Sequence, residues 1–190
     1  LEFRRVLFRS SFVKGVTGTI QDTNWKAQAD TAVTWGAKES RSEVQLLTDR
    51  ILIRVEKANG AVQFLSRDGK KLLTENPSEP RLLLDSQTWN FFAWDKNERL
   101  KSKGVLADDF MDLSTKARYI SFGQKKLRMP LVLSNKGYAI GVAAGSTVLF
   151  CNVRTYGQYI YTQGTGQIDY YFIYDENQER NIEQYRNLPV

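Results

Sequence analysis

The sequence predicts a mainly β protein, an antiparallel β-sandwich with one helix at its C-terminal end. Three observations support this fold class. Apolar and polar residues alternate with a period of two in several segments, turn signals separate these segments at short intervals, and helical periodicity is confined to residues 175–188. With 190 residues, 42% of them hydrophobic, the chain is long enough to form one packed domain.

The clearest pattern is a three-stranded meander from Arg50 to Glu75. Its first strand, RILIRV, places Ile51, Ile53 and Val55 on one face. Asn59-Gly60 then supplies a hairpin turn before AVQFLS, and Asp68-Gly69 supplies the next turn before KKLLTE.

Further strands are expected on both sides of an irregular stretch. After the break NPSEP, the segments RLLLD and WNFFAWD are typical of strands, whereas residues 96–126 are polar, lack a period and are long for a connection. Strand patterns return in LRMPLVLS, YAIGVAA, TVLFC, RTYGQYIYTQ and QIDYYFIY. Ten to twelve short strands favour a sandwich of antiparallel sheets.

The last segment, DENQERNIEQYRNL, predicts a helix. Asp175 and Gln178 have the spacing of a capping box, and Ile182, Tyr185 and Leu188 recur at helical spacing. We expect this apolar stripe to pack on an element outside the chain.

Composition excludes several classes of function. The chain has no histidine, which removes Ser-His-Asp and Cys-His catalysis and the usual zinc sites, and we predict no metal and no cofactor. The single cysteine, Cys151, lies in an apolar run and is expected to be a buried, unreactive thiol. The net charge of +6 is scattered without long basic runs, so we predict no nucleic-acid partner, and no apolar stretch is long enough for a membrane helix.

The opening segment, LEFRRVLFRS, fits neither a presequence nor a basic arm. It lacks a long apolar core and a small-residue cleavage site, and it is too apolar for a solvated tail. All ten residues match the translation of a short-read sequencing adapter. We therefore interpret residues 1–10 as a non-native, adapter-derived segment and Ser11 as the first native position. The compartment stays open, with the cytoplasm favoured.

Three segments, in order, carry a resemblance to a known family. They are ILIRVEKANGAVQFLSRDGKKLLTEN (51–76), MPLVLSNKGYAIGV (129–142) and IDYYFIYDENQERNIEQYRNL (168–188). Together they resemble the N-terminal domain of family 31 glycoside hydrolases, which include α-glucosidases and α-xylosidases. The resemblance implies a galactose-mutarotase-like β-sandwich over residues 11–175 and a helix over 176–190 that leads to an absent (β/α)₈ barrel.

The resemblance also implies a function. The chain would be an accessory fragment of a retaining α-glycosidase, which packs on the barrel and shapes the sugar-binding subsite. Its partners would be an α-linked oligosaccharide or glycoside and the intramolecular barrel. The nucleophile and the acid–base of such enzymes lie at barrel strand ends, so no residue here is assigned a catalytic role, and the fragment is expected to be inactive alone. An exposed apolar patch is expected around Ile182, Tyr185 and the tyrosine-rich strands, where the barrel packs.

By position, residues 96–128 correspond to the family's loop over the barrel mouth. Two family motifs, E-R-x-Y-G-L-G and W-N-x-D, are here ERLKSKGV (98–105) and RYISFGQ (118–124), so this loop departs from the family pattern. Carboxylates bind sugar hydroxyls, and rings such as Phe110 can stack on sugars. The candidate substrate-binding residues are Asp108, Asp109, Asp112 and Tyr119. The alternative is a solvated acidic turn or a helix start capped by Asp109.

Other functions remain open at this point: a free-standing carbohydrate-binding β-sandwich, an aldose-epimerase-like enzyme, which the absence of histidine disfavours, or a non-catalytic interaction module. Strand alternation places Trp89 and Phe91 on one face and Phe92 and Trp94 on the other. At least one of these faces is expected to be core.

Overall fold

The computed structural model describes residues 6–13, 34–103, 110–114, 118–122, 130–142, 147–153, 155–164 and 167–188. These residues form sixteen strands and one helix. In chain order the strands are β1 (Val6–Val13), β2 (Trp35–Glu39), β3 (Glu43–Thr48), β4 (Ile51–Glu56), β5 (Val62–Ser66), β6 (Lys71–Thr74), β7 (Arg81–Leu84), β8 (Gln87–Phe91), β9 (Leu100–Lys103), β10 (Phe110–Asp112), β11 (Arg118–Ser121), β12 (Leu131–Ser134), β13 (Tyr138–Val142), β14 (Thr147–Val153), β15 (Gly157–Gln163) and β16 (Gln167–Tyr174), followed by the helix α1 (Gln178–Arg186).

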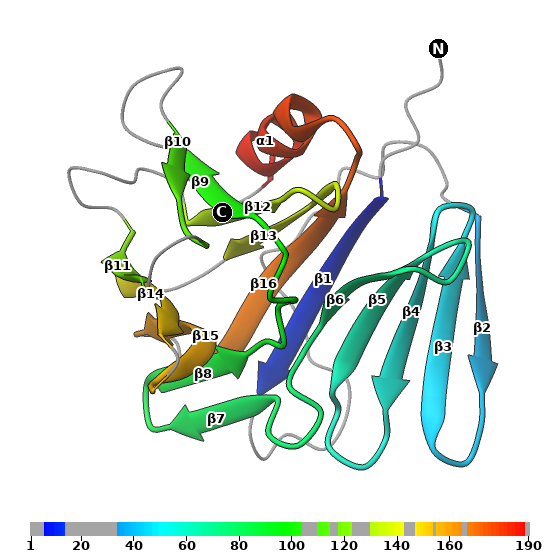
Figure 1. Cartoon of the computed structure of the whole chain (residues 1–190). Helices are drawn as coiled ribbons and strands as arrows, with labels where there is room; N and C mark the ends of the chain where they lie inside the picture. Colours follow the sequence, from blue (N-terminus) through cyan, green and yellow to red (C-terminus); the bar gives the residue numbers. More distant parts are fainter. Residues whose placement is uncertain are drawn as a thin grey trace.

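The strands form three antiparallel sheets (Figure 1). The central sheet has the order β1-β16-β13-β12-β9-β10. The meander sheet has the order β2-β3-β4-β5-β6, and the aromatic sheet has the order β11-β14-β15-β8-β7. The predicted fold class, an antiparallel β-sandwich with one C-terminal helix, is confirmed.

One face of the central sheet carries the main core, against both other sheets. The Phe172 ring of β16 stacks on Phe64 of the meander sheet with 3.9 Å between ring centroids. Two residues earlier on the same strand, Tyr170 meets the edge of Phe92, just beyond β8, at 5.7 Å. These side chains belong to one continuous apolar cluster. Because side chains alternate along a strand, Tyr171 and Ile173 face the opposite side.

Helix α1 covers that opposite side (Figure 1). Ile182 and Tyr185 are 2% and 5% exposed, in a second cluster with Leu131, Leu133, Ala139, Tyr171 and Ile173. The expectation of an exposed apolar patch around Ile182 and Tyr185 is therefore wrong, because the stripe of the helix has its partner within this chain. Strands β12 and β13 are buried on both faces, which explains why they are apolar without alternation.

The helix also begins later than its sequence pattern suggests. Its N-cap is Asn177, whose side chain accepts a hydrogen bond from the Glu179 amide. Asp175 is not the cap: its amide donates to the carbonyl of Gly137 at 3.0 Å, so it continues the backbone pairing just beyond the end of β16. Its carboxylate instead accepts from the Asn177 amide at 2.9 Å and shapes the turn before the cap.

The predicted meander is confirmed and belongs to a longer sheet. Gly60 and Gly69 occupy its two turns with φ of 72° and 87°, the left-handed region that glycine adopts without strain. Residues 96–126, expected to be an irregular connection, contain β9, β10 and β11 within their described part. The pairing of β9 with β12 holds the first of these in the sheet, which a period-two pattern cannot reveal.

Residues 6–10 belong to β1, which pairs with β16 from Val6↔Tyr174 to Val13↔Gln167. Phe8 meets the edge of Phe64 at 5.5 Å. Strand pairing uses backbone groups, which every extended segment offers. The pairing therefore does not bear on the DNA origin of residues 1–10, and the adapter interpretation stays a prediction.

Among the residues that the structure describes, no helix has the length and hydropathy that a membrane span requires.

Candidate functional site

The structure places two of the four predicted sugar-binding residues on different sheets. Asp112 ends β10 at one edge of the central sheet and is exposed; its Oδ1 accepts hydrogen bonds from the Ser114 amide at 2.8 Å and from the Ser114 hydroxyl at 2.9 Å. Tyr119 lies in β11, at an edge of the aromatic sheet, opposite Cys151. Asp108 and Asp109 lie outside the described residues. The sugar-binding role of all four stays a prediction.

Phe110, named with them as a ring for sugar stacking, lies among cations. The ammonium groups of Lys101 and Lys103 lie 4.0 Å and 4.4 Å from its ring centroid. Both distances are within the range of cation–π attraction. The ring also packs partly against the cluster beneath helix α1.

Glu98 joins the stretch 96–128 to one of the segments that carry the family resemblance, residues 129–142. Its carboxylate accepts hydrogen bonds from the hydroxyls of Ser134 and Tyr138, and Lys136 forms an ion pair with it at 3.0 Å. The Glu98 side chain is 1% exposed. The glutamate of ERLKSKGV and the serine, lysine and tyrosine of LSNKGY therefore form one buried cluster that holds the β12–β13 hairpin.

Tyr138→Phe tests this cluster. Burial and the adjacent Glu98 charge hold the pKa of Tyr138 well above its usual value of 10, so the hydroxyl stays a donor. Its loss is expected to lower the free energy of unfolding by about 1.5–3 kcal/mol, as for hydrogen bonds to charged groups. Urea unfolding at pH 7 measures the loss. Tyr156→Phe is the control, because Tyr156 is 69% exposed. Equal urea midpoints for the two variants would show that the Tyr138 hydroxyl does not stabilise the cluster.

The outward face of the aromatic sheet carries pairs of rings across neighbouring strands. Trp89 of β8 lies 5.0 Å from Tyr161 of β15, and Phe91 lies 5.6 Å from Tyr159. All four rings are partly exposed. The register extends these rows, since Leu82 is opposite Trp89 and Leu149 is opposite Tyr161. We call this surface the aromatic face, and it comprises Leu82, Trp89, Phe91, Leu149, Tyr159 and Tyr161.

The aromatic face and its surroundings lack charge. The described side chains that alternation places on this side of β7, β8, β14 and β15 include no Asp, Glu, Lys or Arg; they belong to Leu82, Leu84, Gln87, Trp89, Phe91, Thr147, Leu149, Cys151, Val153, Tyr159, Tyr161 and Gln163. On the outward side of the meander sheet, by contrast, Arg54 lies between Gln45 and Gln63. No described element covers the aromatic face (Figure 1).

The sequence predicted only part of this surface. It separated Trp89 and Phe91 from Phe92 and Trp94 and predicted that at least one pair is core; the structure confirms this and shows that it is the second pair, 3% and 6% exposed. It could not place Tyr159 and Tyr161 beside the first pair, because that requires the register of β15 on β8. Cys151 is buried, as predicted.

A buried ion pair links the three sheets. Glu75 follows β6 and is fully buried; its carboxylate binds the Arg81 guanidinium of β7 and accepts from the Val62 amide and the Tyr170 hydroxyl, each at 2.8 Å. Burial raises the pKa of Glu75, while the charge and hydrogen bond of Arg81 and the other donors act against this rise.

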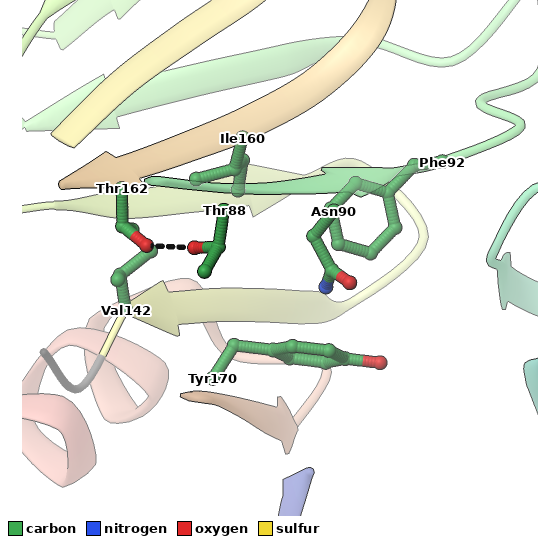
Figure 2. A pocket seen from close by; sticks show the side chains of 7 residues that line it. All are labelled: Thr88, Asn90, Phe92, Val142, Ile160, Thr162 and Tyr170. Carbon is green, nitrogen blue, oxygen red and sulfur yellow. Dashed lines mark hydrogen bonds between the residues drawn. The ribbon is translucent and has the colours of Figure 1, made fainter. Parts of the chain in front are cut away.

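Next to this pair, a small pocket lies between the aromatic and central sheets (Figure 2). Thr88 and Asn90 reach into it from β8, and Tyr170 forms part of the opposite wall. The hydroxyls of Thr88 and Thr162 are hydrogen-bonded to each other. In the described part of the chain, no three acidic or cysteine side chains are grouped so that they can hold a metal ion.

These features define a β-sandwich whose most distinctive surface is an uncharged aromatic face. No protein-family model matches the sequence, and no curated protein matches it. Solved structures do match. A GH31 dextranase from Flavobacterium johnsoniae, complexed with isomaltotriose, aligns with 82% of this chain at 19% identity and a TM-score of 0.66.

Two further structures align with almost the whole chain. The cycloalternan-forming enzyme of Listeria monocytogenes, in complex with a pentasaccharide substrate, covers 95% of it at 16% identity and a TM-score of 0.70. A GH31 α-xylosidase from a soil metagenome, complexed with xylose, covers 97% at 18% identity and a TM-score of 0.67. The chain spans only 20%, 18% and 30% of these three proteins. Its fold is thus one that occurs in GH31 enzymes.

Proposed function

We propose that the chain is the N-terminal accessory domain of a family 31 retaining α-glycosidase. The observation that carries this proposal is the fold, which matches GH31 enzymes over 82–97% of the chain while covering 20–30% of each of them. The remainder of such a protein would contain the (β/α)₈ barrel, whose strand-end carboxylates perform the hydrolysis. The domain itself would contribute binding surface and no catalytic group.

The aromatic face is the surface that we assign to the barrel. In an antiparallel sandwich the side chains on the outward side of a sheet are ordinarily polar, whereas those of the aromatic face are mostly apolar or aromatic. Aromatic residues are enriched and charged residues depleted at the centres of protein interfaces. The orientation of the rings also favours a protein partner. The angle between the two ring planes is 57° for Trp89 and Tyr161 and 72° for Phe91 and Tyr159. Neither pair therefore forms a flat platform on which a sugar ring could stack.

The shaping of the sugar subsite is the finer part of the proposal. It assigns contact with an α-linked oligosaccharide or glycoside to Asp108, Asp109, Asp112 and Tyr119. What supports it is that carboxylates and aromatic rings are good partners for sugars, and that Asp112 is exposed at a sheet edge.

The test uses the complete protein that the gene encodes, with Trp89→Ser and Tyr161→Ser combined. Interface aromatics cost about 2–4 kcal/mol when truncated, so we expect a lower melting temperature and at least tenfold lower kcat/KM on an aryl α-glucoside or α-xyloside. Trp35→Ser is the matched control, because Trp35 is 66% exposed on the meander sheet.

Three outcomes would count against the proposal. If the double variant matched the control in both measurements, the aromatic face would not bind the barrel. If the 190-residue chain alone hydrolysed either glycoside, the accessory role would be wrong. Quenching of Trp89 fluorescence by an α-linked oligosaccharide, in the isolated chain, would instead favour a free-standing carbohydrate-binding domain.

A further inference from the structure

The pocket between the aromatic and central sheets is lined by buried side chains. Its lining residues are all at most 7% exposed: Thr88, Asn90, Phe92, Val142, Ile160, Thr162 and Tyr170. The cavity volume open to the centre of a water molecule is about 10 Å³. That is about the space that one water molecule requires.

Asn90 gives this pocket a polar wall. The residue is 5% exposed, and among the described residues neither its amide nitrogen nor its amide oxygen has a hydrogen-bond partner. Figure 2 shows the amide reaching from β8 into the gap towards Tyr170 on the opposite sheet. A side-chain amide offers two donor hydrogens and an acceptor oxygen, and buried groups of this kind are almost always bonded in folded proteins.

Two hydroxyls complete the set of polar groups. Thr88 and Thr162 face each other across β8 and β15 and share one hydrogen bond. Each hydroxyl has one hydrogen and two lone pairs, so the pair retains a donor hydrogen and free lone pairs. A buried water ordinarily makes two to four hydrogen bonds, and the amide with the two hydroxyls can supply that number.

The chemistry of the lining selects the ligand. It includes no charged side chain, so it offers nothing to neutralise an ion. Phe92, Val142 and Ile160 form the apolar part of the lining, and the volume suits a single small molecule. We propose that this pocket is a binding site for one long-lived water molecule, held by the Asn90 amide and the hydroxyls of Thr88 and Thr162.

Such a water would lie beside a polar connection that runs through the core. The ring of Tyr170 forms one wall of the pocket. The hydroxyl of Tyr170 donates a hydrogen bond to the Glu75 carboxylate, which forms an ion pair with Arg81. The water would fill the space between the two sheets at a point where Asn90 and the threonines interrupt the apolar contacts. It would therefore be a structural part of the sandwich.

A crystal structure of the chain at a resolution that shows ordered waters is the first test. We expect one water within hydrogen-bond distance of the Asn90 amide and of at least one of the two threonine hydroxyls. Magnetic relaxation dispersion of the solvent is the second test, because it counts water molecules whose residence time exceeds the rotational correlation time of the protein. Asn90→Leu is expected to lower that count by one.

Tyr138→Phe is the matched control, since it removes a buried hydrogen bond elsewhere on the central sheet and should leave the count unchanged. If Asn90→Leu does not fold, Thr162→Val replaces it and is expected to shorten the residence of the water. A crystal structure in which the Asn90 amide bonds directly to protein groups, or an unchanged count in a folded Asn90→Leu variant, would overturn the proposal.

Discussion

Replacing Arg81 by glutamine is expected to lower the free energy of unfolding by about 3–5 kcal/mol at pH 7, the cost of breaking a buried ion pair by removing one partner. The variant leaves the Glu75 carboxylate in the core without its cation. Because Glu75 also bonds to Val62 and Tyr170, the loss affects the place where all three sheets meet. Urea unfolding measures it.

The loss should depend on pH in a defined direction. Burial raises the pKa of Glu75 above its usual value of 4.5, and removing Arg81 removes the charge that opposes this rise. A carboxyl group with a raised pKa in the folded state favours folding most below its unfolded pKa, and that contribution is lost as the pH rises through the folded pKa. The variant should therefore be closer to the native chain at pH 4 than at pH 7.

Two further variants complete this test. Lys57→Gln breaks the exposed pair with Glu39 and should leave the urea midpoint unchanged. Glu75→Leu combined with Arg81→Met replaces both charges by apolar groups and should recover much of the stability. A loss in Arg81→Gln that is the same at pH 4 and pH 7 would show that the Glu75 charge is not its cause.

Tyr185→Ala is expected to cost about 3–5 kcal/mol of unfolding free energy, as for other buried aromatic side chains. Tyr185 is 5% exposed, and its hydroxyl donates to the Val142 carbonyl at 3.0 Å. Its ring lies directly over Gly141 of β13: a Cβ at that glycine would be 2.3 Å from two ring carbons. The helix thus approaches the sheet closely because residue 141 has no side chain.

The pair supports a double-mutant cycle. Gly141→Ala should destabilise the native chain by about 1–3 kcal/mol through overpacking, and much less in the Tyr185→Ala background, where the ring is absent. Chemical denaturation of all four proteins gives the coupling. Strictly additive effects would contradict the close packing of helix α1 on the central sheet.

Local signals in the sequence predicted much of the fold. Alternation in RILIRV, and the glycines after Asn59 and Asp68, identify the meander because a hairpin is specified by neighbouring residues. The sequence predicted that the last segment is a helix, but it did not predict the surface on which the helix packs. A stripe of Ile182, Tyr185 and Leu188 shows that one side is buried, yet it does not say against what. Only the topology shows that the outer side of the central sheet receives it.

The candidate site was less predictable, since it depends on contacts between distant segments. Tyr170 and Glu75 are 95 residues apart, and nothing local marks them as partners. Trp89 and Tyr161 become neighbours only through the register of β8 and β15. Glu98 lies in a segment that departs from the family motif, and its bonds to Ser134 and Tyr138 require β12 and β13 to be in place.

The proposal that this β-sandwich is the accessory part of a longer glycosidase is tested by the sequence of the coding DNA beyond the Val190 codon. We expect an open reading frame that continues into alternating strands and helices of a (β/α)₈ barrel, with aspartates at strand ends. A stop codon directly after Val190 in the genomic DNA would contradict it.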